Sequence, residues 1–172
     1  MTKTKTAVIC GVLAALALAV SWLESLLPLS LLVPLPGVKL GLANVITMFA
    51  LYFLGAVPAL LILTARCVLS ALMWGGVTAL AFSLTGGIFA LAVMFFVKRF
   101  SAFSLLGVSM CGAAAHNLGQ MAACVVLLGS TAPLSYLAVL LPAGLVTGIA
   151  TGSLCAPLFN RLGSALGGKT LP

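Results

Sequence analysis

The segment Ser109–Gln120 holds the residues of this chain that are best equipped to do chemistry. His116 is the only histidine, and it stands in a long apolar run close to Asn117 and Gln120. At 3.6 residues per turn, Ser109, His116 and Gln120 fall on one face of a helix, with Asn117 beside them. Such side chains are costly inside a bilayer and usually face a bundle interior or a cavity. They donate and accept hydrogen bonds, so we expect them to form one wall of a binding site.

Several kinds of catalysis are excluded by what the chain lacks. It contains no aspartate and a single glutamate, Glu24, whereas Mg²⁺-dependent diphosphate chemistry needs clustered carboxylates. There is no nucleotide-binding Gly-x-x-x-x-Gly-Lys-Ser/Thr loop. His116 has no second metal ligand nearby, and no acid is placed to orient it as a base. We therefore expect no enzyme, no metal site and no cofactor.

The composition indicates an integral membrane protein. Of the 172 residues, 63% are hydrophobic and 5% are charged, and the mean hydropathy is +1.35. Soluble domains carry about 25% charged residues. The net charge of +7 comes from basic residues scattered between apolar runs, which do not form a patch for nucleic acid. The lipid bilayer is the expected surrounding.

The apolar runs predict an all-α bundle of six transmembrane helices, forming a single domain over residues 1–172. Each run is near the ~20 residues needed to cross the hydrocarbon core. The predicted helices are Thr6–Leu27, Val38–Leu54, Ala59–Trp74, a fourth from the Gly75-Gly76 turn to Val97, Ser104–Leu128 and Leu134–Leu162. Three prolines between Pro28 and Gly37 predict a non-helical connection.

The basic residues predict the orientation. With the N-terminus inside, six of them lie in cytoplasmic segments, namely Lys3, Lys5, Lys98, Arg99, Arg161 and Lys169. Only Lys39 lies on the opposite side, and Arg66 lies within a span. The positive-inside rule therefore predicts that both termini are cytoplasmic.

A rise of 1.5 Å per residue places the unusual polar groups at one depth. The group comprises Glu24, Lys39, Asn44, Arg66, His116, Asn117 and Gln120. Two cations stand against one acid in this set, so an anionic or polar ligand would balance the charge of Arg66. We predict an outward-facing pocket for a small solute, with Lys39 and Glu24 at its mouth. The alternative is that these groups only hold the helices together.

Small residues form two stripes at four-residue spacing. Gly144, Gly148 and Gly152 follow one face of the last helix, and internal close packing is the simpler interpretation. Gly11, Ala15 and Ala19 follow one face of the first helix. For this second stripe, docking of a partner and internal packing both remain open.

Four motifs lie between residues 36 and 120: Pro36-Gly-Val-Lys-Leu-Gly-Leu-Ala-Asn44, Ala65-Arg66, Leu84-Thr-Gly-Gly87 and Ala115-His-Asn-Leu-Gly-Gln120. Together they resemble the bacterial family described both as Gx transporter and as heptaprenyl diphosphate synthase component I. The length, the predicted helices and the stripe on the first helix also resemble the S components of energy-coupling-factor transporters.

The resemblance implies an S-component-like bundle in the bacterial cytoplasmic membrane. In S components, a stripe comparable to Ala15 and Ala19 docks onto a transmembrane coupling subunit, and separate ATPase subunits drive import. The other family description implies a non-catalytic membrane partner of a polyprenyl diphosphate synthase. A structural membrane subunit of an electron-transfer assembly is a third possibility. The resemblance does not identify a ligand, so a vitamin-like or flavin-related molecule and an isoprenoid or quinone precursor all stay open.

Overall fold

A computed structural model describes residues 3–27 and 39–165, and every regular element among them is helical. The elements are α1 (Lys3–Ser25), α2 (Asn44–Phe53), α3 (Ala56–Ser70), the π-helical segment η2 (Ala71–Gly75), α4 (Gly76–Val97), α5 (Leu105–Leu128), the 3-10 segment η3 (Ala132–Tyr136) and α6 (Leu137–Ala165). The predicted all-α class is thereby confirmed. The predicted connection Pro28–Gly37 and the basic residue Lys169 lie outside the described residues.

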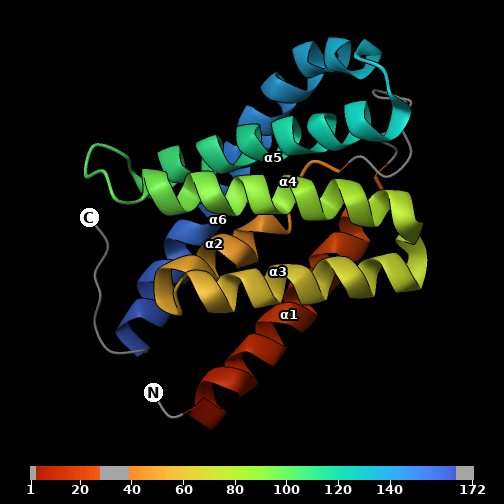
Figure 1. Ribbon diagram of the computed structural model, residues 1–172. Helices are drawn as coiled ribbons and strands as arrows, with labels where there is room; N and C mark the ends of the chain where they lie inside the picture. Colours follow the sequence, from red (N-terminus) through yellow and green to blue (C-terminus); the bar gives the residue numbers. More distant parts are fainter. Residues whose placement is uncertain (1–2, 28–38, 166–172) are drawn as a thin grey trace.

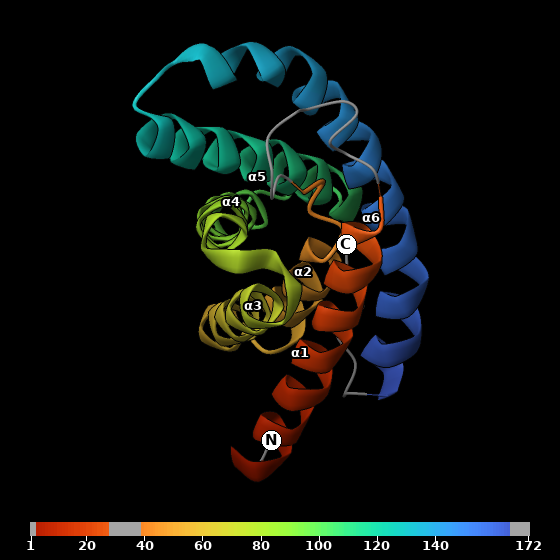
Figure 2. The same ribbon diagram turned by 90° about the vertical axis from the view of Figure 1, so that its right-hand side faces the viewer.

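The longest apolar stretch folds back on itself. Ala56–Val97 spans 42 residues, about twice the length that one crossing requires. Within it, α3 ends in η2, and Gly76 has a φ of +69° that L side chains rarely adopt. α3 and α4 therefore lie antiparallel and side by side (Figures 1 and 2). The turn predicted at Gly75-Gly76 is confirmed.

The helix predicted over Val38–Leu54 is shorter in the structure. α2 begins only at Asn44, because the preceding residues are not helical and Gly41 has a φ of +83°. Its ten residues rise about 15 Å, half the thickness of the hydrocarbon core. Seven of the ten are buried, and α2 lies among the longer helices (Figure 2). The apolar side chains of α2 therefore pack against the neighbouring helices.

By length and composition, four stretches of the described chain could cross a membrane: Thr4–Ser25, Ala56–Val97, Leu105–Leu128 and Ala132–Pro157. The chain is thus a multi-pass membrane protein. The start of α1, the turn between α4 and α5 and the end of α6 lie at one end of the bundle, on the left of Figure 1. Because α2 is too short to cross alone, the count of six complete spans stays a prediction, as does the cytoplasmic side of the termini.

Glycines allow α5 and α6 to approach closely. A Cβ added at Gly148 would lie 2.8 Å from the Cα of Met110, and one at Gly152 would lie 2.9 Å from Cδ1 of Leu106. Gly144 faces Asn117 in the same way. The stripe on α6 therefore serves internal packing, as its simpler interpretation predicted.

Candidate functional site

Six of the predicted site residues gather in the interior of the bundle. We call this group the polar cluster; it consists of Glu24, Lys39, Asn44, Arg66, His116 and Gln120. All six are buried, with exposed fractions between 1% and 8%. They come from α1, the segment before α2, α2 itself, α3 and α5. Elements far apart in the sequence thus supply one buried polar region.

Lys39 is fastened to α5 through its backbone. Its N–H donates to Oε1 of Gln120 at 2.9 Å, and Nε2 of Gln120 donates back to its carbonyl at 2.6 Å. The side chain reaches the other way, and Nζ donates to the hydroxyls of Ser21 and Ser70 at 3.2 Å each. Burial lowers the pKa of the Lys39 amine, the Glu24 carboxylate opposes that effect, and the charge of Arg66 lowers the pKa further.

Glu24 holds the chain just before α2. Its Oε1 accepts from the N–H of Gly41 at 2.5 Å and from the N–H of Leu42 at 3.3 Å. These amides belong to the turn that precedes α2, and the carboxylate supplies the acceptor that they need when buried. Oε2 of Glu24 has no hydrogen-bond partner. Glu24 is 1% exposed and Lys39 is 7% exposed, so they are buried anchors and do not form the exposed mouth that the sequence suggested.

Arg66 projects from α3 into the same interior and is 1% exposed. Its Nε and Nη2 have no hydrogen-bond partner. The hydrogen bonds of the Glu24 carboxylate go to the backbone amides of Gly41 and Leu42, so it does not satisfy these two nitrogens of Arg66. A buried guanidinium with two unsatisfied nitrogens is the most costly group of the cluster.

His116 is enclosed by two glycines. A Cβ at Gly41 would lie 2.8 Å from Cδ2 of the imidazole, and a Cβ at Gly86 would lie 2.9 Å from Cε1. The imidazole lies beside the Gly86 backbone, but neither ring nitrogen makes a hydrogen bond of good geometry, and both side-chain polar atoms of Asn44 have no partner. The cluster therefore contains unsatisfied donors and unsatisfied acceptors next to one another.

The structure separates Asn117 from this group. Its Nδ2 donates to the carbonyl of Leu140 on α6 at 2.5 Å, and Oδ1 has no partner. Ser109 likewise faces α6, since its hydroxyl lies 2.8 Å from that of Thr151. These two polar residues of α5 link it to α6. For Asn117, the prediction that it shares a wall with His116 is wrong.

Four further residues shape the cluster, and none of them was predicted from the sequence. Ser21 precedes Glu24 by three residues and Ser70 follows Arg66 by four, so helical spacing alone places each beside its neighbour. Gly41 and Gly86 stand inside two of the motifs that carried the family resemblance. Within the described part of the chain, no group of three or more His, Cys, Asp or Glu side chains could hold a metal ion.

The small-residue stripe of α1 lies on the surface. Gly11, Ala15 and Ala19 are exposed, and nothing lies within 4 Å of a Cβ added at Gly11. Ala15 and Ala19 also line an apolar groove of about 370 Å³, together with Trp22 and Trp74. Among the described residues, no helix packs closely on Gly11, so internal packing does not explain that position.

A comparison with known protein families finds the same family that the four sequence motifs resemble. The model of heptaprenyl diphosphate synthase component I matches residues 13–158. The chain belongs to this family. The match to heptaprenyl diphosphate synthase component I contains all six residues of the polar cluster and begins just after Gly11. No curated protein and no solved structure matches the chain.

Proposed function

We propose that the polar cluster binds a small anionic solute, and that the chain is the substrate-binding subunit of an energy-coupling-factor importer in the bacterial cytoplasmic membrane. The observation that carries this proposal is Arg66, which is 1% exposed and leaves Nε and Nη2 without partners. An anion at this place would accept from both nitrogens, and charge-assisted bonds of that kind are the strong ones.

The charge of the cluster supports an anion over a cation. Lys39 and Arg66 are set against Glu24, which is the only acidic side chain of the chain. The ammonium of Lys39 and the carboxylate of Glu24 are each held by hydrogen bonds within the protein. Arg66 is left as the group that a ligand would neutralise. His116 and Asn44 would supply further donors and acceptors to a polar solute.

The importer role rests on three further features. The chain has no nucleotide-binding loop, so energy would come from separate ATPase subunits. Gly11, Ala15 and Ala19 lie exposed on α1, where a transmembrane coupling subunit could pack closely. The chain has no aspartate and one glutamate, so it lacks the clustered carboxylates that Mg²⁺-dependent diphosphate chemistry needs.

The test is solute binding by an Arg66 variant. The wild-type chain and Arg66→Gln are purified gently in detergent, and native mass spectrometry reports the bound small molecule. With the molecule so identified, isothermal titration should show affinity reduced by about 10- to 100-fold in Arg66→Gln. Lys5→Gln removes one positive charge from an exposed position outside the cluster, and it should bind like wild type. Equal binding by all three proteins would exclude the cluster as the site.

The family description favours a second function. A component I of heptaprenyl diphosphate synthase would be a non-catalytic membrane partner of a soluble synthase. In that case, the chain should co-purify with a polyprenyl diphosphate synthase and should alter the length of its product. Co-purification with coupling and ATPase subunits, and without a synthase, would instead favour the importer.

A further inference from the structure

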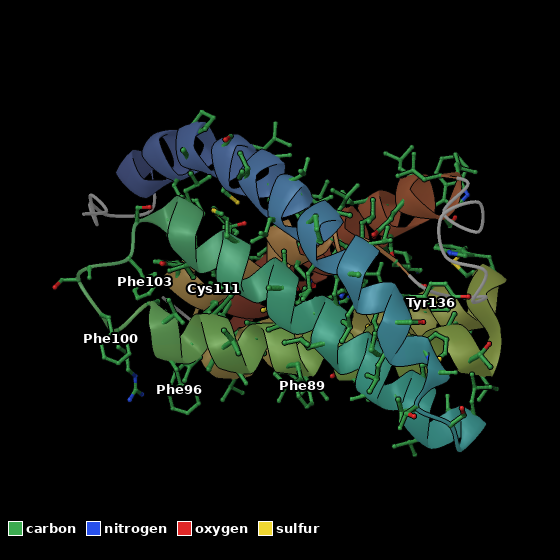
Figure 3. All side chains as sticks on the ribbon, turned by 90° about the horizontal axis from the view of Figure 1, so that it is seen from above. Phe89, Phe96, Phe100, Phe103, Cys111 and Tyr136 are labelled. Atoms are coloured by element: carbon green, nitrogen blue, oxygen red, sulfur yellow. The ribbon has the colours of Figure 1, made fainter. Side chains whose placement is uncertain are left out.

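A second polar region lies at the turn between α4 and α5, at the other end of α4 from the turn at Gly76 (Figure 1). It is a pocket of about 270 Å³ with two cations, Lys98 and Arg99, and three aromatic rings, those of Tyr52, Phe100 and Phe103. None of these residues belongs to the polar cluster. Phe100 is 62% exposed and Phe103 is 44% exposed, and both are labelled at this end of the bundle in Figure 3.

The two cations are held in place by aromatic rings. Cζ of Arg99 lies 4.4 Å from the ring centroid of Phe95, and Nζ of Lys98 lies 5.6 Å from the same centroid. Nζ of Lys98 also lies 5.5 Å from the centroid of Tyr52 and donates to the carbonyl of Leu51 at 3.0 Å. Cation–π contacts hold both positive charges beside the pocket, and the hydrogen bond further fixes that of Lys98.

An apolar groove lies one helical turn along α4 from the two cations, and Phe95 and Phe96 are among its lining residues. It has a volume of about 300 Å³ and runs between α3 and α4, with Val57, Leu60, Ile88 and Leu91 in its walls. Phe95 lines this groove and also carries the two cations. Val57 and Ile88 are 70% and 43% exposed, so the groove faces the surroundings of the bundle. The ring of Phe95 thus lines the exposed groove and also contacts the two cations of the pocket.

We propose that this two-part surface binds one anionic phospholipid, with its phosphate in the pocket and an acyl chain in the groove. Basic and aromatic residues at the end of a span lie at headgroup level, where each cation attracts anionic lipid. A free anion would need the pocket alone, whereas the adjoining groove fits a hydrocarbon chain. A zwitterionic headgroup fits less well, because the only acidic side chain of the chain, Glu24, is in the polar cluster.

The experiment measures lipid retention by the full chain. Protein in detergent is mixed with equal amounts of phosphatidylglycerol and phosphatidylcholine, and native mass spectrometry counts each lipid retained. Wild type should prefer phosphatidylglycerol, and Arg99→Gln should weaken that preference by about 5-fold. Lys5→Gln removes an exposed cation at the same end of the bundle and should leave the preference unchanged. The exposed position of Arg99 makes misfolding of its variant a minor concern.

A second variant tests the groove separately. Ala92 lines it and is exposed, so Ala92→Phe should fill it and reduce retention of both lipids. Val126→Phe adds the same ring at a position on α5 that is 81% exposed, and it should have no effect. The proposal is overturned if Lys5→Gln acts like Arg99→Gln, if inorganic phosphate displaces the lipid at an equal concentration, or if farnesyl diphosphate displaces it at lower concentration.

Discussion

Gln120 and Arg66 are each 1% exposed, but they differ in whether their polar atoms have hydrogen-bond partners. Both side-chain polar atoms of Gln120 bond to the backbone of Lys39. Arg66 keeps two nitrogens without a partner. A buried polar group that is satisfied stabilises the fold, whereas an unsatisfied one costs free energy that an added ligand can recover. Gln120 is therefore an anchor, and Arg66 is a contact for a ligand.

Replacement of Gln120 by methionine tests its role as an anchor. Gln120→Met keeps the size of the side chain but leaves the N–H and the carbonyl of Lys39 without their partner. We expect the free energy of unfolding to fall by about 2–4 kcal/mol, since each buried backbone group loses one hydrogen bond. Circular dichroism during chemical unfolding in mixed micelles measures this loss.

The control is a threonine on α3. Thr64 is exposed and bonds only to a carbonyl of its own helix, so Thr64→Val should change the free energy by less than about 0.5 kcal/mol. A Gln120→Met protein as stable as Thr64→Val would show that the hydrogen bonds to Lys39 contribute nothing.

Residue types predicted most of the polar cluster, and one error has a clear cause. The rise per residue along each predicted helix put Glu24, Arg66 and His116 at a similar depth in the membrane. Charged and polar side chains avoid lipid, so at that depth they share the interior of the bundle. Asn117 was assigned to the same wall as His116. Consecutive helical residues point about 100° apart, so neighbours in sequence face different helices. His116 faces Gly86 on α4, whereas Asn117 faces Leu140 on α6.

At the scale of elements, α4 and α5 meet backbone to backbone at a pair of glycines. A Cβ at Gly119 would lie 2.8 Å from the Cα of Gly86, and a Cβ at Gly86 would lie 2.8 Å from the carbonyl oxygen of His116. Backbone atoms cannot move aside as the end of a flexible side chain can. This contact sets the distance between the two helices, and it determines how deeply His116 enters the polar cluster.

Two matched alanine variants test this contact. Gly86→Ala should destabilise the bundle by about 1–3 kcal/mol, because the added methyl must push the helices apart. Gly11→Ala adds the same methyl on α1, where nothing lies within 4 Å, and it should stabilise by about 0.5–1 kcal/mol through helix propensity. Thermal unfolding of both proteins in one detergent gives the comparison. Two shifts of the same sign would contradict the close contact at Gly86.

The helix α2 shows that an apolar run predicts a helix more reliably than it predicts that the helix crosses the membrane. Residues 38–54 are as apolar as a membrane span, and the breaks at Lys39 and Gly41 are short. Burial by protein and burial by lipid select the same residue types, so composition cannot tell them apart. The turn at Gly75-Gly76 was predictable because two glycines interrupt the helical pattern.

At the scale of the molecule, the distribution of basic residues predicts which end faces the cytoplasm. Lys98 and Arg99 lie in the turn between α4 and α5, whereas the turn between α5 and α6 carries no charge. Because cytoplasmic loops are enriched in lysine and arginine, the first of these turns should be inside.

Cysteine labelling in intact cells tests this orientation. The five native cysteines are first replaced by alanine, and one exposed serine is then changed in each turn. Ser130→Cys should react with a membrane-impermeant maleimide added outside, and Ser101→Cys should react only after the cells are opened. The reverse pattern would invert the proposed topology and would place the Lys98 and Arg99 pocket in the outer leaflet.

The short length of α2 also has a consequence for biogenesis. Ten residues are too few to leave the translocon as an independent span. The ring of Phe49 on α2 packs 5.4 Å from that of Phe159 near the end of α6, and the thiol of Cys155 bonds to the carbonyl of Val45. The ribosome makes more than a hundred residues between these partners. The contacts of α2 with α6 therefore form only after the chain has been made as far as Phe159, so the packing around α2 is completed late in synthesis.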